Sequence, residues 1–321
     1  MSPTKVIFDT DPGIDDAMAL LFIKASKALD LVGITTVMGN ASIETTTRNA
    51  LFLKQQFGIS APVARGAGVP LNGVVGPIPH AVHGKNGLGD IHLPQVDESG
   101  LSPLSAAQFI IDTVKANPGE VTIIAVGRMT NLALALRQEP GIAALVKEVV
   151  IMGGAFGYNG HGGNVTPAAE ANIHGDPLAA DEIFGAAWKV TVIGLDVTQE
   201  ALMDTAYLTD LRDRAGEHGQ LIWDMTRLYQ NFYHEVTGVD GIFGHDSLAV
   251  AYVIAPELFT TRSGPIRVVT EGIAEGQTIQ QPDTRKFSHG DWSGRPSQHV
   301  AVGSQNQRIL DLYMDVVTGS K

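Results

Sequence analysis

A dense group of carboxylates near the N-terminus is the first feature of the sequence that could do chemistry. Asp9, Asp11, Asp15 and Asp16 fall within eight residues, and a Pro-Gly pair separates the first two from the last two. Like charges this close repel one another, whereas Ca²⁺ and Mg²⁺ prefer carboxylate oxygens as ligands. A helix N-terminus favours acidic side chains, but that accounts for only one or two of the four. The density of the group predicts a site for a divalent cation.

A second candidate pair, His245 and Asp246, stands far along the chain, directly before an apolar run at residues 248–254. Taken alone, Asp246 is explained as the cap of a helix, and His245 as a structural histidine. Considered together with the acidic group, Asp246 would complete a metal site and His245 would donate a proton. The pair itself leaves both interpretations open.

A third patch combines amides and a carboxylate among small residues: Asn164, Glu170 and Asn172. Carboxylate and amide groups together suit the recognition of hydroxyl groups. The alternative is a polar loop that caps a helix starting at Asp176. The sequence favours neither the hydroxyl-binding interpretation nor the capping interpretation.

Two histidines, His80 and His83, lie in a Gly/Pro-rich segment at residues 66–90. A metal site is disfavoured because no third nitrogen or sulfur ligand is nearby, and Pro79 disfavours a regular helix. We expect a loop that contributes one histidine to a pocket. Tyr229 and Tyr233 are weaker candidates for a pocket wall, because their helical spacing is more typical of core packing.

The elements that would position these residues follow from hydrophobic periodicity. Strands are expected at residues 6–9, 31–37, 62–64, 121–126, 148–152, 190–195, 266–270 and 298–302. Helices are expected at residues 15–28, 43–57, 103–116, 130–137, 176–187, 220–235, 246–254 and 307–317, and an irregular loop at residues 272–295.

This alternation predicts an α/β fold: one domain over residues 1–321, with a mostly parallel, doubly wound (Rossmann-like) sheet covered on both faces. Such sheets bind ligands beyond the carboxyl ends of their strands. Asp11, Asn40, Gly127 and Gly153 each follow an expected strand. The active site is therefore expected at the C-terminal ends of the strands.

Composition narrows the class of function. The 321 residues are 44% hydrophobic, which supports a sizeable core, and the net charge of −12 argues against binding to nucleic acid or anionic membranes. The absence of cysteine excludes disulfides and thiolate chemistry. No signal segment is recognisable and no apolar run reaches the ~20 residues of a membrane helix, so a cytoplasmic protein is expected.

Several of these patches together resemble one family. Residues 9–17 closely resemble the N-terminal signature of the inosine-uridine preferring nucleoside hydrolases. Further matching segments follow in order across nearly the whole chain, at residues 37–40, 130–133, 151–155, 166–170, 176–177, 195–198 and 245–246. The resemblance implies Ca²⁺-dependent hydrolysis of the N-glycosidic bond of ribonucleosides, pyrimidine nucleosides, inosine or both, to ribose and free base.

The resemblance also implies roles for individual residues. Ca²⁺ would be held by Asp11, Asp16, Asp246 and the backbone carbonyl of Val126. Catalysis would involve Asp11 as general base toward a Ca²⁺-bound water, Asn40 beside that water, and His245 as the acid that helps the base leave. The substrate-binding residues would be Asp15 and Asn172 at the ribose 2′ and 3′ hydroxyls, Asn164 and Glu170 at the 5′ hydroxyl, and His83 and Met152.

The departures from the family pattern weaken the assignment of the substrate more than they weaken the assignment of the reaction class. Ala171 stands where many members have Phe, and Ser247 where Pro is common; the context of Gly244 is also less usual. Contacts to the base are expected from residues 66–90 and 220–244. The family further implies a homo-oligomer, dimer or tetramer, with a small nucleoside as its partner.

Two alternatives accompany this interpretation. The Asp-Thr-Asp sequence at residues 9–11 superficially fits a HAD-type Mg²⁺ phosphohydrolase, although that class leaves Asp15, Asp16 and the pair at residues 245–246 unexplained. A non-catalytic nucleoside- or sugar-binding protein on the same scaffold is the second. Retention of all the proposed catalytic carboxylates argues against it.

Overall fold

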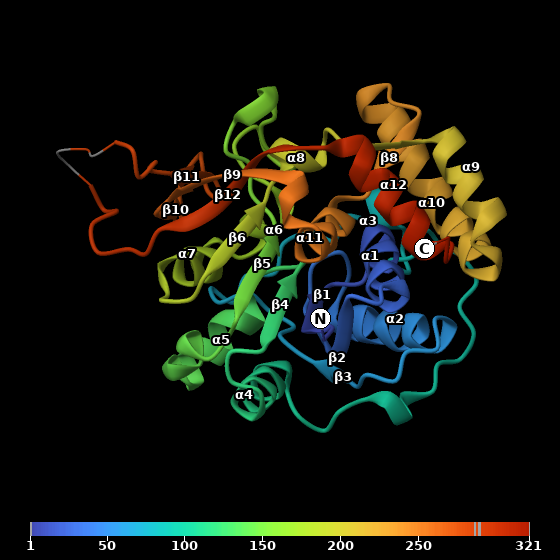
Figure 1. Ribbon diagram of the computed structural model, residues 1–321, viewed down its shortest axis with the longest axis horizontal. Helices are drawn as coiled ribbons and strands as arrows, with labels where there is room; N and C mark the ends of the chain where they lie inside the picture. Colours follow the sequence, from blue (N-terminus) through green and yellow to red (C-terminus); the bar gives the residue numbers. More distant parts are fainter. Residues whose placement is uncertain (1, 286, 288–289, 321) are drawn as a thin grey trace.

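The computed structural model describes residues 2–285, 287 and 290–320, and its centre is one eight-stranded sheet. Seven strands run parallel and the edge strand β9 runs antiparallel to β12 (Figure 1). Their order across the sheet is β3 (Val63–Arg65), β2 (Leu29–Thr36), β1 (Thr4–Thr10), β4 (Val121–Ala125), β5 (Glu148–Met152), β6 (Val190–Ile193), β12 (Gln298–Ser304) and β9 (Phe259–Gly264). The order 3-2-1-4-5-6 is that of a doubly wound α/β sheet, so the predicted fold class is confirmed.

Both faces of the sheet are buried, because successive residues of a strand point to opposite faces. In β1, Val6 and Phe8 pack into one apolar cluster and Ile7 into another. One face is covered by α1 (Ile14–Ala25), α2 (Ile43–Gln56), α10 (Gly216–Thr237), α11 (His245–Ile254) and α12 (Asn306–Val317). The other face is covered by α4 (Ala106–Ala116), α5 (Thr130–Gln138) and α7 (Pro177–Gly185). Strands that are buried on both faces have nearly continuous apolar sequences, as in β4 and β5.

Smaller elements complete the chain. Two two-stranded antiparallel sheets are formed by β7 (Leu202–Asp204) with β8 (Gly241–Phe243) and by β10 (Ile266–Val268) with β11 (Thr278–Gln280). The remaining α-helices are α3 (His80–His83), α6 (Ala171–Gly175), α8 (Leu195–Thr198) and α9 (Thr205–Arg214). Single 3-10 turns occur at η1 (Glu98–Gly100), η2 (Pro140–Ala144), η3 (Tyr158–Gly160) and η4 (Pro256–Leu258).

Three local expectations are wrong. Pro79 does not prevent a helix, because it lies at the N-cap of α3, where a missing N–H is harmless. The segment at residues 272–295 is not wholly irregular, since β11 forms within it by pairing with β10. The first expected helix also ends earlier, with Ser26 as its C-cap.

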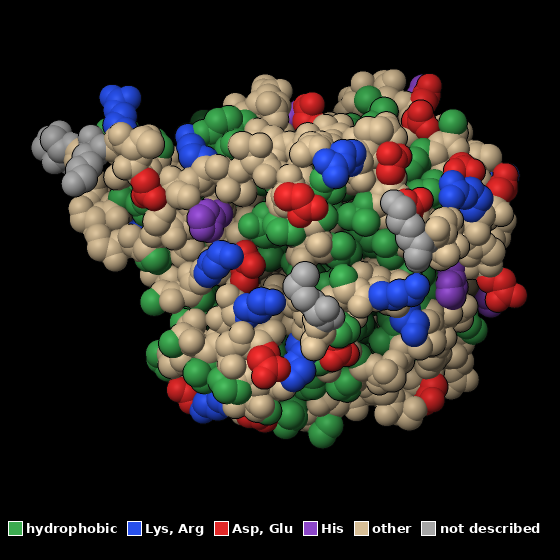
Figure 2. Space-filling model, in the orientation of Figure 1, with side chains coloured by type: hydrophobic (Ala, Val, Ile, Leu, Met, Phe, Trp, Pro, Cys, Tyr) green, Lys and Arg blue, Asp and Glu red, His purple; other side chains and the backbone are tan. Residues whose placement is uncertain are grey.

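The distribution of charge on the surface and the hydropathy of the helices are consistent with the composition of the sequence. On the face shown in Figure 2, basic side chains are scattered among acidic ones. Within the described part of the chain, no helix has the length and apolar character that a membrane span needs.

Candidate active site

The candidate residues meet where the order of the sheet reverses. The chain leaves β1 toward β2 on one side, whereas β4 lies on the other side of β1. Ligand crevices of open α/β sheets form at this switch point, beyond the carboxyl ends of the strands. Asp11 directly follows β1, and Val126 directly follows β4. Topology alone therefore brings these two predicted residues together.

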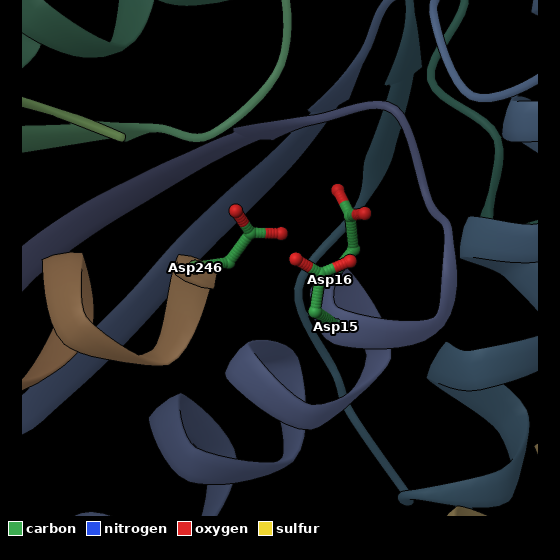
Figure 3. Close-up of side chains that lie close together, drawn as sticks. All are labelled: Asp15, Asp16 and Asp246. Carbon is green, nitrogen blue, oxygen red and sulfur yellow. The ribbon is translucent and has the colours of Figure 1, made fainter. Parts of the chain in front are cut away.

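Three buried carboxylates converge there from two helices. Oxygens of Asp15, Asp16 and Asp246 all lie within 4.8 Å of one another. Asp15 and Asp16 stand in the first turn of α1, and Asp246 in the first turn of α11, from which it points toward the other two (Figure 3). This geometric trio contains Asp15, for which a ribose contact was predicted, and lacks Asp11, a predicted metal ligand.

Asn40, in the loop after β2, links Asp11 to this trio. Its backbone N–H donates to Asp11 Oδ2 at 2.8 Å, and its side-chain Nδ2 donates to Asp16 Oδ2 at 3.0 Å. Asp16 also accepts from the Thr10 hydroxyl and from the Gly13 N–H. Asn40 thus holds both carboxylates, beyond the C-terminal end of β2.

One oxygen of Asp11 is left without a partner. Its Oδ1 is buried and, among the described residues, receives no hydrogen bond. Buried polar atoms are almost always satisfied, so this oxygen fits a site that holds a cation or a water molecule. Two glycines make room for this carboxylate: a Cβ on Gly39 would lie 1.9 Å from Asp11 Oδ2, and one on Gly127 would lie 2.7 Å from Oδ1.

The third patch borders the same space. Asn172 Nδ2 donates to the carbonyl of Val126 at 2.7 Å and to that of Met152 at 3.1 Å. Glu170 caps α6 and accepts from the backbone N–H groups of Gly154, Asn172 and Ile173. Two oxygens offer about four acceptor positions, so Glu170 keeps capacity for a hydroxyl.

Asn164 belongs to the patch through the start of α6. Its Oδ1 accepts from the N–H of Ala171 at 3.0 Å. Ala171 itself is exposed. The predicted 5′-hydroxyl residues therefore lie at one helix start, beside a small and open position.

His245 stands at the end of a chain of hydroxyl groups. Its Nε2 lies 2.7 Å from the Tyr233 hydroxyl, which lies 3.1 Å from the Tyr229 hydroxyl. On the other side, its Nδ1 lies 2.7 Å from Thr198 Oγ1. Burial lowers the pKa of His245 to about 4, so the ring is neutral at pH 7. Thr198 lies in the matching segment at residues 195–198, but sequence reasoning gave it no role, because its contact with His245 spans 47 positions of the chain.

His83 lies beside the first turn of α1 and the ring of Tyr229. Its Nδ1 accepts the N–H of Ile14 at 3.2 Å, which fixes the proton on Nε2, and its ring centroid lies 5.5 Å from that of Tyr229. Burial, with a smaller contribution from His245, lowers the pKa of His83 to about 3. His80 does not join the site; its Nδ1 lies near the carbonyl of Gly84.

Comparison with known proteins identifies the family of this chain. The family model of the inosine-uridine preferring nucleoside hydrolases matches residues 6–311. The chain belongs to this family. Members are N-ribosyl hydrolases, so the chain is an enzyme of that class, and the resemblance predicted from its ordered motifs is confirmed.

Individual nucleoside hydrolases agree over nearly the full length. Uridine nucleosidase 1 of Arabidopsis thaliana is 43% identical over 309 residues, which cover 96% of this chain and 91% of that protein. A solved plant nucleoside hydrolase, PpNRh1, superposes with a TM-score of 0.94 at 37% identity and covers 98% of this chain and 99% of its own. A purine-preferring ribonucleoside hydrolase of Gardnerella vaginalis has a TM-score of 0.89 at 34% identity, with 98% of both chains covered.

The electrostatics of this nucleoside hydrolase site favour a bound cation. Burial, and then repulsion by neighbouring carboxylates, raises the pKa values of Asp11, Asp15 and Asp246 well above their usual range. Burial also raises the pKa of Asp16. Arg128 partly opposes this effect on Asp11. A single guanidinium cannot balance four ionised carboxylates, whereas a divalent ion would hold them ionised.

Proposed function

We propose that this nucleoside hydrolase uses Ca²⁺ to cleave ribonucleosides, with uridine, cytidine and inosine as the candidate substrates, to ribose and free base. The observation that carries the proposal is the convergence of three buried carboxylates, those of Asp15, Asp16 and Asp246, beside Asp11, which Asn40 links to Asp16 and whose Oδ1 has no partner among the described residues. The relatives named uridine nucleosidase favour a pyrimidine nucleoside, and the purine-preferring structural relative keeps inosine in the set.

Four oxygen donors would hold the ion: the carboxylates of Asp11, Asp16 and Asp246 and the carbonyl of Val126. Asp15 is close enough to Asp16 and Asp246 to share in binding it. An all-oxygen, mainly anionic set suits Ca²⁺. When bound, the ion orients the vicinal hydroxyls of ribose and makes a water molecule more acidic.

Asp11 would act as general base. A base must lie within hydrogen-bond reach of the proton it removes and must be ionised. The unpartnered Oδ1 is available for that contact, while the N–H of Asn40 holds Oδ2 in place. Asn40 would therefore align both the base and its water.

Side chains on α1, on α6 and in the segment before α6 would bind the sugar. Asp15 and Asn172 would hold the 2′ and 3′ hydroxyls, and Asn164 and Glu170 the 5′ hydroxyl. Hydrogen bonds that tighten as the reaction proceeds lower the barrier as well as the dissociation constant. The buried carboxylates would also stabilise the positive charge that develops on the ribose when the base departs.

His245 would assist the departing base. The resting imidazole is neutral because burial lowers its pKa to about 4, so a bound base must stabilise its protonated form before a proton can transfer. Tyr233 and Thr198 hold the ring on both nitrogens and set its orientation. His83, Tyr229 and Tyr233 would face the base, in agreement with the segments expected to contact it.

The first test is incubation of the purified protein with Ca²⁺ and a panel of ribonucleosides, with products resolved by chromatography. Release of free base and ribose from uridine, cytidine or inosine is expected. A 5′-monophosphate and a 2′-deoxynucleoside serve as controls, since loss of the 2′ hydroxyl removes one contact. If no ribonucleoside yields free base, the proposal is wrong and a non-catalytic binding protein becomes the better explanation. Phosphate release from the monophosphate would support the phosphohydrolase alternative, against which family membership already argues.

For His245→Ala, we expect a loss that depends on the leaving group. The variant should lose roughly a hundredfold or more in kcat with uridine, as is typical for removal of a general acid. It should lose much less with p-nitrophenyl riboside, whose leaving group needs no proton. Thr198→Val is the matched variant, because it removes only the contact that orients the ring. Equal losses on both substrates would contradict the role of His245 as acid.

The cytoplasmic location and the homo-oligomeric state expected from the sequence stay predictions. So does the base preference within the proposed substrate set.

A further inference from the structure

Asn49, in the middle of α2, is fully buried and joins two segments of the candidate site. Its Nδ2 donates to the carbonyl of Pro12 at 3.1 Å and to the carbonyl of Asn86 at 2.9 Å. One amide nitrogen has two protons, so these two bonds use its full donor capacity.

The two carbonyls belong to functionally distinct segments. Pro12 lies in the turn between Asp11 and the first turn of α1, which carries the acidic group. Asn86 lies in the loop after α3, the short helix that ends at His83. The N–H of Gly89 donates back to the carbonyl of His83 at 2.9 Å, so this loop and the histidine form one unit.

The orientation of the Asn49 amide is fixed by its neighbour. Arg48 donates from Nη2 to Asn49 Oδ1 at 2.9 Å and to the carbonyl of Asn86 at 3.0 Å. A guanidinium has only donors, so the oxygen of Asn49 must face Arg48 and its nitrogen must face the two carbonyls. A Cβ on Gly87, at φ 80°, would lie 2.7 Å from this nitrogen, so the loop packs closely against it.

Asn86 gives the loop its internal structure. Its Oδ1 accepts the N–H groups of Leu88 and Asp90, and its Nδ2 donates to the carbonyl of Ile91. The loop is thus a preformed body whose attachment to the acidic turn consists of few bonds. Those among the described residues are the Asn49 bridge and the bond from the Ile14 N–H to His83 Nδ1.

We propose that Asn49 is a positioning residue that docks the His83 loop onto the turn that carries Asp11, and so couples the two sides of the site. The effect on catalysis rests on the proposed function. Loss of the bridge leaves the acidic turn in place, because Thr10, Gly13 and Asn40 still hold Asp16. The loop loses one of its two attachments to the turn and keeps only the bond between Ile14 and His83, with Arg48 still holding it to α2, so its contact with the substrate weakens before and during the reaction.

The test compares Asn49→Ala and Asn49→Asp with the wild type by hydrogen exchange and by kinetics. Exchange at Gly89 and across residues 84–91 is expected to accelerate at least about tenfold, since local opening costs less once the bridge is gone. With an accepted nucleoside, KM is expected to rise roughly tenfold while kcat changes by less than about threefold, the pattern for loss of uniform binding.

Thr46→Val is the matched control. Thr46 is buried on the same helix, and its hydroxyl donates only to the Ile43 carbonyl within α2. If Thr46→Val accelerates exchange at residues 84–91 as much as Asn49→Ala, the effect is general loosening of α2 and the inference is overturned. Unchanged exchange in both Asn49 variants overturns it too.

The two readouts separate this inference from the proposed function. Hydrogen exchange needs no turnover, so faster loop exchange in a protein that cleaves no nucleoside would support the bridge and contradict the function. Nucleoside cleavage with unchanged loop exchange in the Asn49 variants would support the proposed function and contradict the bridge.

Discussion

Asp11→Asn is expected to reduce kcat/KM by roughly a thousandfold or more, because one substitution removes both a general base and a charged ligand of the ion. Asparagine keeps the size of the side chain and can still accept the N–H of Asn40. The loss would therefore report the missing charge and not a collapsed site. Initial rates on the nucleoside that the wild type cleaves best, at saturating Ca²⁺, provide the measurement.

Asp9→Asn is the matched control, two positions earlier, near the end of β1. Asp9 is buried behind the site, where its Oδ1 accepts from Thr35 and Asn131. Burial raises the pKa of Asp9 to about 7, so a neutral amide resembles its protonated form at neutral pH. We expect Asp9→Asn to retain activity within about tenfold, a change typical of altered positioning.

The comparison has two outcomes that would contradict the assignment. Substantial activity in Asp11→Asn would mean that another group removes the proton. Similar losses in both variants would mean that any change of charge in this buried region is damaging. Unfolding curves accompany the kinetics, and relief of repulsion among the carboxylates should make Asp11→Asn at least as stable as the wild type without metal.

Much of the site could be predicted because it depends on periodicity and strand ends. An apolar run followed by Asp11, and another followed by Gly127, place both residues at the carboxyl edge of a parallel sheet. Asn40 and Gly153 follow from the same argument, whereas Val126 and Met152 are implied only by the family resemblance. The reversal of strand order between β1 and β4 then decides which of these ends meet.

The rest depends on contacts that local sequence does not encode. The short strands β7, β8 and β9 have weak apolar patterns of their own and form by pairing with distant segments. Thr198 beside His245 and Asn49 beside Pro12 are common polar residues until the fold supplies their partners. The place of Asp15 in the geometric trio could not be predicted either, because it depends on the angle at which α11 meets α1.

Removal of divalent ions is expected to abolish activity and to change how stability depends on pH. Burial raises the folded-state pKa of Asp9 from 3.8 to about 7, and those of Asp11, Asp15, Asp16 and Asp246 also rise. Each group binds its proton more tightly in the folded state than in the unfolded state. The free energy of unfolding of the metal-free protein should therefore fall as the pH rises from about 4 through about 7.

Calcium should reverse this trend. The ion binds ionised carboxylates, so protons compete with it and its stabilising effect should grow with pH. Thermal unfolding in EGTA and in Ca²⁺ at pH 5, 6, 7 and 8 should show two melting temperatures that diverge as the pH rises. Asp246→Asn is the informative variant: it should raise the metal-free melting temperature at pH 7 and largely remove the response to Ca²⁺. A metal-free melting temperature that rises with pH, or an enzyme that keeps its activity in EGTA, would show that these carboxylates do not hold a required ion.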